Sequence, residues 1–333
     1  MNTRHYFISA LLLFSLNAYA DLNERVDELI RTLPGRPVMS GKDRPTKLGL
    51  LYLMDHIESQ GMIDLAATGY VPIVKTDRHS NDRCRWVVDK NPDAIWVMAS
   101  GEAFDIENET PKQAADRYYE RAVLDMSAVP ESYRDRVDFI EVTPCMWEPV
   151  TVEAANWYVE YLIELLPRMT DMPRPIVLNS GVGGIPTEGH ILDAMAPGLR
   201  LAHHVGGAWG YHGYSIHYST DVDNELWYAL RYRQPYAHFR EHHPEIADLP
   251  MILLEGGIDY RGDPDNDGWL ARGTLEEFQN WLEWYNGELM KDDYVLGVTL
   301  FKIGAPTIWK SFELEPVVPW LLEHYREAYG DAE

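Results

Sequence analysis

The chain has 333 residues, of which 53 are Asp or Glu, 29 are Lys or Arg, and 46% are hydrophobic. That hydrophobic fraction allows a substantial core and excludes a disordered or low-complexity chain. The formal net charge of −24 argues against a protein that binds DNA or RNA, because such affinity comes largely from clustered Lys and Arg.

The first twenty residues have the pattern of a secretory signal peptide. Arg4 precedes an apolar stretch from Tyr6 to Leu16, and residues 18–20 read Ala-Tyr-Ala, the small-x-small pattern of a cleavage site. The stretch is too short for a membrane-spanning helix, and no later segment reaches about 18 uninterrupted apolar residues. We therefore expect a secreted or periplasmic protein that does not contact a membrane.

After an amphipathic segment at 21–33, short apolar runs alternate with longer segments of helical periodicity. Eight apolar runs lie at 47–54, 70–74, 94–99, 138–143, 175–178, within 199–210, at 250–254 and at 294–301. Helical periodicity marks 111–123, 151–166, 224–241, 274–289 and 317–329. Apolar runs that are bounded by polar turns and alternate with helices predict parallel strands buried on both faces.

Eight strand–helix units in roughly 280 residues fit a closed barrel. The alternative, an open doubly wound sheet, needs a Gly-rich phosphate loop after the first run, where the chain reads Asp55-His56-Ile57-Glu58. We predict an α/β protein with one domain, a closed parallel (β/α)8 TIM barrel over residues 47–333. An N-terminal helical segment, 21–46, and the signal peptide, 1–20, precede it.

In such a barrel the reactive side chains lie at the C-terminal ends of the strands. Polar and aromatic residues close most of the runs, and those we expect to bind substrate are Asp55, Lys75, Trp147, Trp209, Tyr211, His212, Tyr214 and Trp309. The aromatic residues suit a sugar ligand, because sugar CH faces pack on aromatic planes.

Two carboxylates follow apolar runs closely: Glu148 after the fourth and Glu255 after the seventh. Side chains from the ends of these strands can converge over the barrel mouth. A carboxyl pair is what hydrolysis of a glycosidic bond requires, since one group protonates the leaving oxygen and the other attacks the anomeric carbon or activates water.

These segments resemble the clan A glycoside hydrolases. Glu148-Pro149 resembles their acid/base segment, the run from Met251 to Gly257 resembles their strand-seven nucleophile segment, and Tyr211-His212-Gly213-Tyr214 is similar to their His-x-Tyr element. Leu300-Phe301 with Trp309 resembles the aromatic end of strand eight, so the resemblance covers about residues 47–315.

The resemblance implies a retaining mechanism without a cofactor, in which Glu148 is the acid/base and Glu255 the nucleophile. It further implies that His212 and Tyr214 line the site and that Trp309 is the sugar platform. One position departs from the pattern: many members have Asn directly before the acid/base, and here it is Trp147. Another side chain must then supply the hydrogen bond to the sugar 2-hydroxyl, or the substrate does not need it.

Three other patterns do not change this expectation. Residues 263–268, Asp-Pro-Asp-Asn-Asp-Gly, resemble a calcium loop, but the twelfth position is Thr274 rather than Glu, so a solvated acidic turn is expected. His238 and His242 have HxxxH spacing without the Glu of HExxH, and we expect no metal site. Cys84 and Cys145 could pair in an oxidising compartment, and the sequence leaves that pairing open.

The sequence thus predicts a retaining glycosidase for a β-linked, largely neutral oligo- or polysaccharide. We expect the environment to raise the pKa of Glu148, so that it carries a proton, while donors such as Tyr214 or His212 keep Glu255 ionised. Two alternatives stay open. One is a carbohydrate-binding barrel without turnover, and the other is a lyase or metal-dependent hydrolase that uses Asp55, Lys75, Asp77 and His212. The oligomeric state is not predicted.

Overall fold

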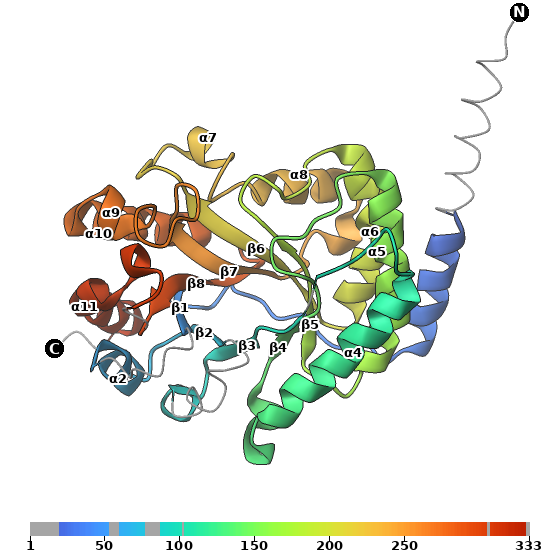
Figure 1. The fold of residues 1–333 in the computed structure, drawn as a ribbon, viewed down its shortest axis with the longest axis horizontal. Coiled ribbons are helices and arrows are strands. Elements are labelled where there is room, and N and C mark those ends of the chain that lie inside the picture. The colour runs from blue at the N-terminus through green and yellow to red at the C-terminus, as the bar shows by residue number, and fades with distance from the viewer. Residues whose placement is uncertain (1–19, 53–59, 77–86, 102, 305–306, 331–333) are drawn as a thin grey trace, which may run out of the picture.

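Eight parallel strands close into a barrel in the order β1 to β8, and β8 pairs with β1 (Figure 1). The computed structural model describes residues 20–52, 60–76, 87–101, 103–304 and 307–330. The predicted closed (β/α)8 barrel is confirmed. The strands are β1 Leu48–Tyr52, β2 Ile73–Thr76, β3 Ile95–Met98, β4 Phe139–Glu141, β5 Arg174–Ser180, β6 Ala208–Ser215, β7 Met251–Ile258 and β8 Val295–Ile303.

Helices surround the barrel on its outer side (Figure 1). Residues 20–32 are helical. The named α-helices are α2 Gln60–Ala67, α4 Pro111–Ala128, α5 Val152–Leu165, α6 Gly189–His204, α7 Val222–Glu225, α8 Arg233–His242, α9 Trp269–Arg272, α10 Leu275–Leu289 and α11 Val318–Tyr329. Short 3-10 helices span Glu131–Arg136, Leu166–Met169, Pro244–Ile246, Lys310–Phe312 and Glu315–Val317. Within the described ranges, no helix is long and apolar enough to span a bilayer.

Side-chain alternation along the strands builds two apolar layers, one inside the barrel and one between the barrel and the helices. The outer layer is the larger cluster and includes the buried faces of α4, α5, α6 and α10. The inner layer consists of Ile73, Ile95, Val97, Phe139, Ile176, Ala208, Ile252, Leu254 and Leu296. The barrel interior is therefore a packed core, and polar side chains beyond this layer face the barrel mouth.

The sixth strand begins near the end of the range predicted for it, 199–210, and continues beyond it. Residues 199–204 belong to the end of α6, and β6 starts at Ala208. Leu199, Leu201 and Ala202 are the buried face of that helix, and a short apolar run does not by itself distinguish a buried helix from a strand. The chain leaves the helix at Gly206, whose φ of +73° suits glycine.

The predicted helix over 224–241 is two helices, α7 and α8, separated by turns. Pro235 explains where the second one starts. Proline has no backbone N–H and its ring collides with the preceding turn, so the first turn of a helix accommodates it best. Because α8 begins at Arg233, Pro235 lies in that first turn.

Glu225, at the end of α7, is a fully buried carboxyl group beside the barrel. The Ser215 hydroxyl donates to its Oε1 at 2.9 Å, and the Ala229 N–H donates to Oε2 at 3.3 Å. Burial outweighs these hydrogen bonds and raises its pKa to about 7. The folded protein therefore holds this proton more tightly than the unfolded chain does.

This raised pKa predicts a pH-dependent stability. As the pH rises from about 4.5 to about 7, the unfolded chain releases the Glu225 proton first, so the free energy of unfolding falls. Glu225→Gln should remove this loss, raising the free energy of unfolding at pH 8 by about 1–3 kcal/mol and changing it little at pH 4.5. Urea unfolding of wild type and Glu225→Gln at pH 4.5 and pH 8 measures this difference in the free energy of unfolding. The exposed Glu323→Gln on α11 is the control, and an equal pH dependence in wild type and Glu225→Gln would contradict the prediction.

Candidate active site

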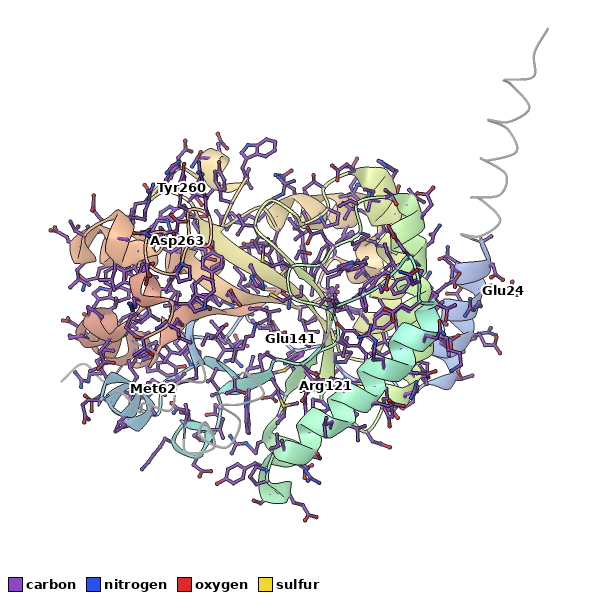
Figure 2. The ribbon with its side chains drawn as sticks, viewed as in Figure 1. Glu24, Met62, Arg121, Glu141, Tyr260 and Asp263 are labelled. Atoms are coloured by element: carbon purple, nitrogen blue, oxygen red, sulfur yellow. The ribbon has the colours of Figure 1, made fainter. Side chains whose placement is uncertain are left out.

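The ends of β2 and β4 place a buried ion pair at the barrel mouth. Ile73 and Phe139 belong to the inner apolar layer, so Lys75 and Glu141, two residues further along each strand, point inward one layer above. Lys75 Nζ lies 2.7 Å from Glu141 Oε1 and 3.9 Å from Glu255 Oε1. Figure 2 marks Glu141 among the strand ends near the middle of the molecule.

Glu255 lies within β7, where the strand pairing is irregular. Leu253 and Glu255 pair with Tyr211 and His212, so β7 has one residue more than β6 at this point. The pairing with β8 shifts over the same residues. Leu254 belongs to the inner apolar layer, and simple alternation would turn the next side chain outward. The bulge re-aims Glu255 into the barrel.

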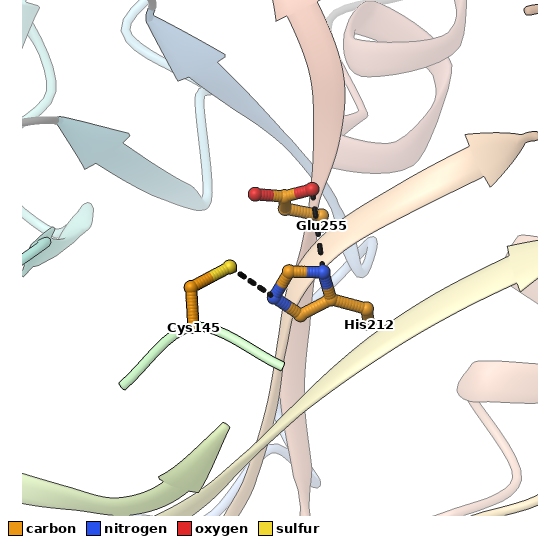
Figure 3. Close-up of side chains that lie close together, drawn as sticks. All are labelled: Cys145, His212 and Glu255. Atoms are coloured by element: carbon orange, nitrogen blue, oxygen red, sulfur yellow. Dashed lines mark hydrogen bonds and ion pairs between the residues drawn. The ribbon is translucent and has the colours of Figure 1, made fainter. Parts of the chain in front are cut away.

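Two side chains of β6 bind the Glu255 carboxylate. The Tyr214 hydroxyl donates to Oε2 at 2.8 Å, and His212 Nδ1 lies 3.3 Å from the same oxygen. On the other side of the imidazole, Cys145 Sγ lies 3.9 Å from His212 Nε2 (Figure 3). The ring thus stands between the thiol and the carboxylate, and Glu255 is held by groups from β2 and β6.

Burial controls the protonation of this cluster. It lowers the pKa of His212, which outweighs the opposite effect of Glu255. It also raises the pKa of Glu141, against the attraction of Lys75. For Lys75, burial acts to lower the pKa, but the charges of Glu141 and Glu255 prevail and raise it. Burial and the charge of Glu255 raise the pKa of the Cys145 thiol to about 12. Near neutral pH, Lys75 is charged, His212 is neutral and Cys145 is a thiol.

Glu148 lies in the segment that follows β4, against the segment that follows β5. The Gly181 N–H donates to its Oε2 at 3.3 Å, and a side chain on Gly184 would collide with Oε1. Burial raises the pKa of Glu148, and the hydrogen bond from Gly181 offsets part of that rise. Glu148 and Glu255 do not contact each other in the part of the chain that the structure describes.

The structure brings Lys75, His212, Tyr214 and Glu255 together, as expected from the strand ends. Trp309 contacts Phe301, with ring centroids 5.3 Å apart, and Phe301 in turn contacts Tyr214 at 6.3 Å. Phe301 therefore lies between the Trp309 ring and Tyr214, which binds Glu255. The backbone of Trp147 pairs with that of Asn179 in β5 as an isolated antiparallel β-bridge. The Trp147 ring packs on Phe104 and Tyr158.

Trp209 and Tyr211 are not at the site, which corrects the expectation for both. Each is fully buried on the outer side of β6. Trp209 packs on Tyr236 and Phe239 of α8, and the Tyr211 hydroxyl donates to the Tyr228 carbonyl. The reason is the two-residue period of a strand: if His212 and Tyr214 face the barrel axis, Trp209 and Tyr211 cannot. Asp55, Asp77 and Cys84 lie outside the described residues.

Sequence reasoning missed Glu141 and Asn179. Glu141 lies inside an apolar run, whereas the reactive side chains of a barrel are expected where the runs end. A charged residue within a buried strand was the available signal, since such a group requires a partner. Asn179 donates to Glu141 Oε2 at 3.3 Å. It faces inward because β5 has an extra residue at Leu178, whose φ is +59°, and no sequence motif marks that bulge.

The acidic loop at 263–268, where Figure 2 labels Asp263, is closed by its own hydrogen bonds. The Asp263 carboxylate accepts from the Asp265 N–H at 2.9 Å and from the Asn266 amide at 3.1 Å. Asp267 Oδ2 accepts from the Asp263 N–H at 3.0 Å. Both carboxylate oxygens of Asp263 and one of Asp267 thus accept hydrogen bonds from the loop itself, as in an ordinary acidic turn. Asp265 Oδ1 lies 3.7 Å from Lys310 Nζ.

No protein-family model and no curated protein sequence matches this chain. Solved structures do resemble it. XacCel5A in complex with cellopentaose has a TM-score of 0.52 at 13% sequence identity, with 84% of this chain and 99% of that chain covered. A glycoside hydrolase family 5 enzyme from Prevotella bryantii B14 has a TM-score of 0.52 at 11% identity, covering 88% of this chain and 100% of the other. The barrel fold implied by the clan A resemblance is confirmed by these structures.

Proposed function

We propose that the chain is a retaining glycoside hydrolase, with Glu255 as nucleophile and Glu148 as acid/base, that cleaves a β-linked, largely neutral oligo- or polysaccharide. The observation that carries this proposal is the setting of Glu255. Its carboxylate lies at the barrel mouth, accepts the Tyr214 hydroxyl hydrogen bond, and has His212 and Lys75 beside it.

This setting suits a nucleophile. The hydrogen bond from Tyr214 fixes one oxygen, and the Lys75 ammonium group offsets negative charge near the other. A carboxylate that is already oriented loses little entropy when it attacks the anomeric carbon. Lys75 itself is a poor candidate for a nucleophilic amine, because its neighbours raise its pKa and an amine must be neutral to attack.

The setting of Glu148 suits the acid/base. Burial raises its pKa, so a larger fraction of it is protonated near neutral pH than of an exposed Glu, as a general acid requires. Its place after β4 puts it at the same end of the barrel as Glu255. Substrate binding between the two would bring the scissile oxygen next to this proton.

The substrate class follows from charge and from the aromatic side chains. A net charge of −24 disfavours a strongly anionic polymer. Trp309, which contacts Phe301 next to Tyr214, offers an aromatic plane for a sugar ring. XacCel5A was solved with cellopentaose, and a variant of the Prevotella enzyme, at a TM-score of 0.50 and 12% identity, was solved with a xyloglucan tetradecasaccharide. We propose that the protein acts in a secreted or periplasmic location, as the N-terminal sequence pattern indicates.

A metal-dependent hydrolase is the second candidate, and a specific observation favours it. Cys145, His212 and Glu255 each offer a ligand atom within 4.8 Å of the others. However, the thiol and the carboxylate lie beside opposite nitrogens of the imidazole (Figure 3), so the ring cannot coordinate an ion next to both without turning. We therefore prefer the metal-free mechanism, which predicts that a chelator leaves the rate unchanged.

Proton NMR of the first product tests the proposal. Wild-type protein is incubated with a panel of defined β-linked oligosaccharides, with and without EDTA. We expect cleavage in both conditions and the β-anomer as the first product, since a double displacement retains configuration. An initial α-anomer would refute the retaining mechanism, and loss of cleavage with EDTA would favour the metal enzyme. Binding without cleavage of any glycan would favour a non-catalytic carbohydrate-binding barrel.

A further inference from the structure

A second cluster of ligand-type side chains lies among the outer helices, between α6 and the C-terminal end of α8. His238 Nε2 and His243 Nε2 lie 2.7 Å and 2.9 Å from the same atom, Oδ1 of Asp193. Asp193 belongs to α6, His238 to α8, and His243 follows the last residue of α8. We propose that these three side chains bind Zn²⁺, with solvent as the fourth ligand, and that this site is independent of the proposed catalysis.

The donor set matches zinc. Two imidazole nitrogens and one carboxylate oxygen are ligands that Zn²⁺ commonly takes, at about 2.0–2.2 Å each. Tetrahedral ligands at such distances are separated by about 3.3–3.5 Å, so each imidazole nitrogen needs to move away from Asp193 Oδ1 by only a fraction of an ångström. The ligand atoms of the three side chains already lie within 4.8 Å of one another. In the metal-free protein each Nε2 donates a hydrogen to Asp193. Zinc would replace both hydrogens, and each neutral ring would carry its proton on Nδ1 instead.

Neighbouring groups support this arrangement. Glu245 Oε1 lies 3.9 Å from His243 Nδ1, where it can stabilise the protonated Nδ1 of a ring that binds metal through Nε2. At Gly189, the first residue of α6, a Cβ would lie 3.0 Å from His238 Cε1, so the glycine leaves room for the ring. Glu245 can therefore support His243 as a ligand, and Gly189 leaves space for the His238 ring.

The exposure of the three side chains fits a partly open site. The side chains of His238 and His243 are 18% and 14% exposed, and that of Asp193 is 50% exposed. The rings are thus held by packing, while the carboxylate side is open to water and to an incoming ion. A structural ion here would link Asp193 of α6 to His238 of α8 and to His243, which lie 45 and 50 positions away in sequence.

His203 provides a matched control. It also lies on α6, and its Nε2 is 3.0 Å from Asp248 Oδ1, but this pair has one imidazole rather than two. Cys145→Ser is the second control, because it removes the thiol from the cluster at the barrel mouth, where zinc could also bind. Together they separate a specific site from general binding of zinc to histidine or cysteine.

Zinc binding is measured by equilibrium dialysis of untagged protein against ZnCl₂ and by thermal unfolding. We expect wild type, His203→Gln and Cys145→Ser to bind zinc alike, with Tm raised by about 4 °C when zinc is at 100 times its Kd. His238→Gln, His243→Gln and Asp193→Asn should each weaken binding at least about tenfold and lose the shift, as removal of a first ligand implies. Circular dichroism without zinc shows which variants are folded. Zinc binding by any one folded ligand variant is enough to test the site.

Two results would overturn the proposal. One is that wild type binds no zinc at about 100 µM, well above the range of ordinary protein zinc sites. The other is that a folded His238→Gln, His243→Gln or Asp193→Asn variant binds zinc as wild type does. Loss of binding in Cys145→Ser alone would place the zinc at the barrel mouth instead. None of these outcomes depends on glycosidase activity.

Discussion

Glu255→Ala is expected to lower kcat on a β-linked oligosaccharide by about 10⁴-fold or more, because it removes the nucleophile that forms the covalent intermediate. Sodium azide should restore turnover of an aryl β-glycoside with a good leaving group. The small anion can enter the space left by the carboxylate and attack the anomeric carbon directly. A single displacement inverts configuration, so the product should be the α-glycosyl azide.

The control for this experiment is Glu323→Ala, an exposed residue on α11, which should keep wild-type kcat with or without azide. Thermal unfolding of Glu255→Ala confirms that loss of turnover is not loss of fold. A folded Glu255→Ala variant with wild-type kcat would show that the nucleophile is elsewhere. Loss of activity without azide rescue, together with an α-anomer from wild type, would indicate an inverting enzyme.

Glu148→Ala has the second largest expected effect, and it should depend on the leaving group. With an oligosaccharide, whose leaving alcohol needs a proton, kcat/KM should fall by about 10²–10⁴-fold. With an aryl glycoside that releases an acidic phenol, the loss in the first step should be less than about tenfold, since that leaving group needs little protonation. Steady-state kinetics on the two substrates, in parallel, measure this difference.

The pH profile tests the same residue independently. Burial raises the pKa of Glu148, and the general acid acts in its protonated form. Wild-type kcat/KM should therefore fall as the pH rises through that pKa, and this alkaline limb should be absent in Glu148→Ala. Equal losses on both substrates with an unchanged alkaline limb would exclude Glu148 as the acid.

Most of the barrel could be predicted because its strands are buried on both faces and its helices have one apolar face. Strand segments are short and continuously apolar, whereas helical segments are longer and have apolar residues every three or four positions. The alternation of the two along the chain predicts a barrel of parallel strands and helices. The errors came where these signals are ambiguous. The strand predicted within 199–210 includes residues 199–204 of α6, because the buried face of a helix is also a short apolar run. The helix predicted over 224–241 is broken between Glu225 and Arg233.

For the proposed site, the sequence predicts where the residues lie along the strands but not the direction of their side chains. The sequence by itself indicated that Lys75, His212, Tyr214 and Glu255 come at strand ends, because each follows a predicted apolar run. In a barrel of parallel strands these ends all lie on the same side. The sequence did not determine which of these side chains point inward. That direction alternates along a strand, and a single extra residue reverses it.

The tertiary structure decided this at the bulges. In β7 the extra residue turns Glu255 toward Tyr214 and Lys75, and in β5 the extra residue at Leu178 turns Asn179 toward Glu141. Regular alternation would have pointed Glu255 and Asn179 at the helices. A bulge depends on how neighbouring strands pair, which is a property of several segments at once. The chemistry of the residues was therefore readable from the sequence, whereas their convergence was a property of the closed barrel.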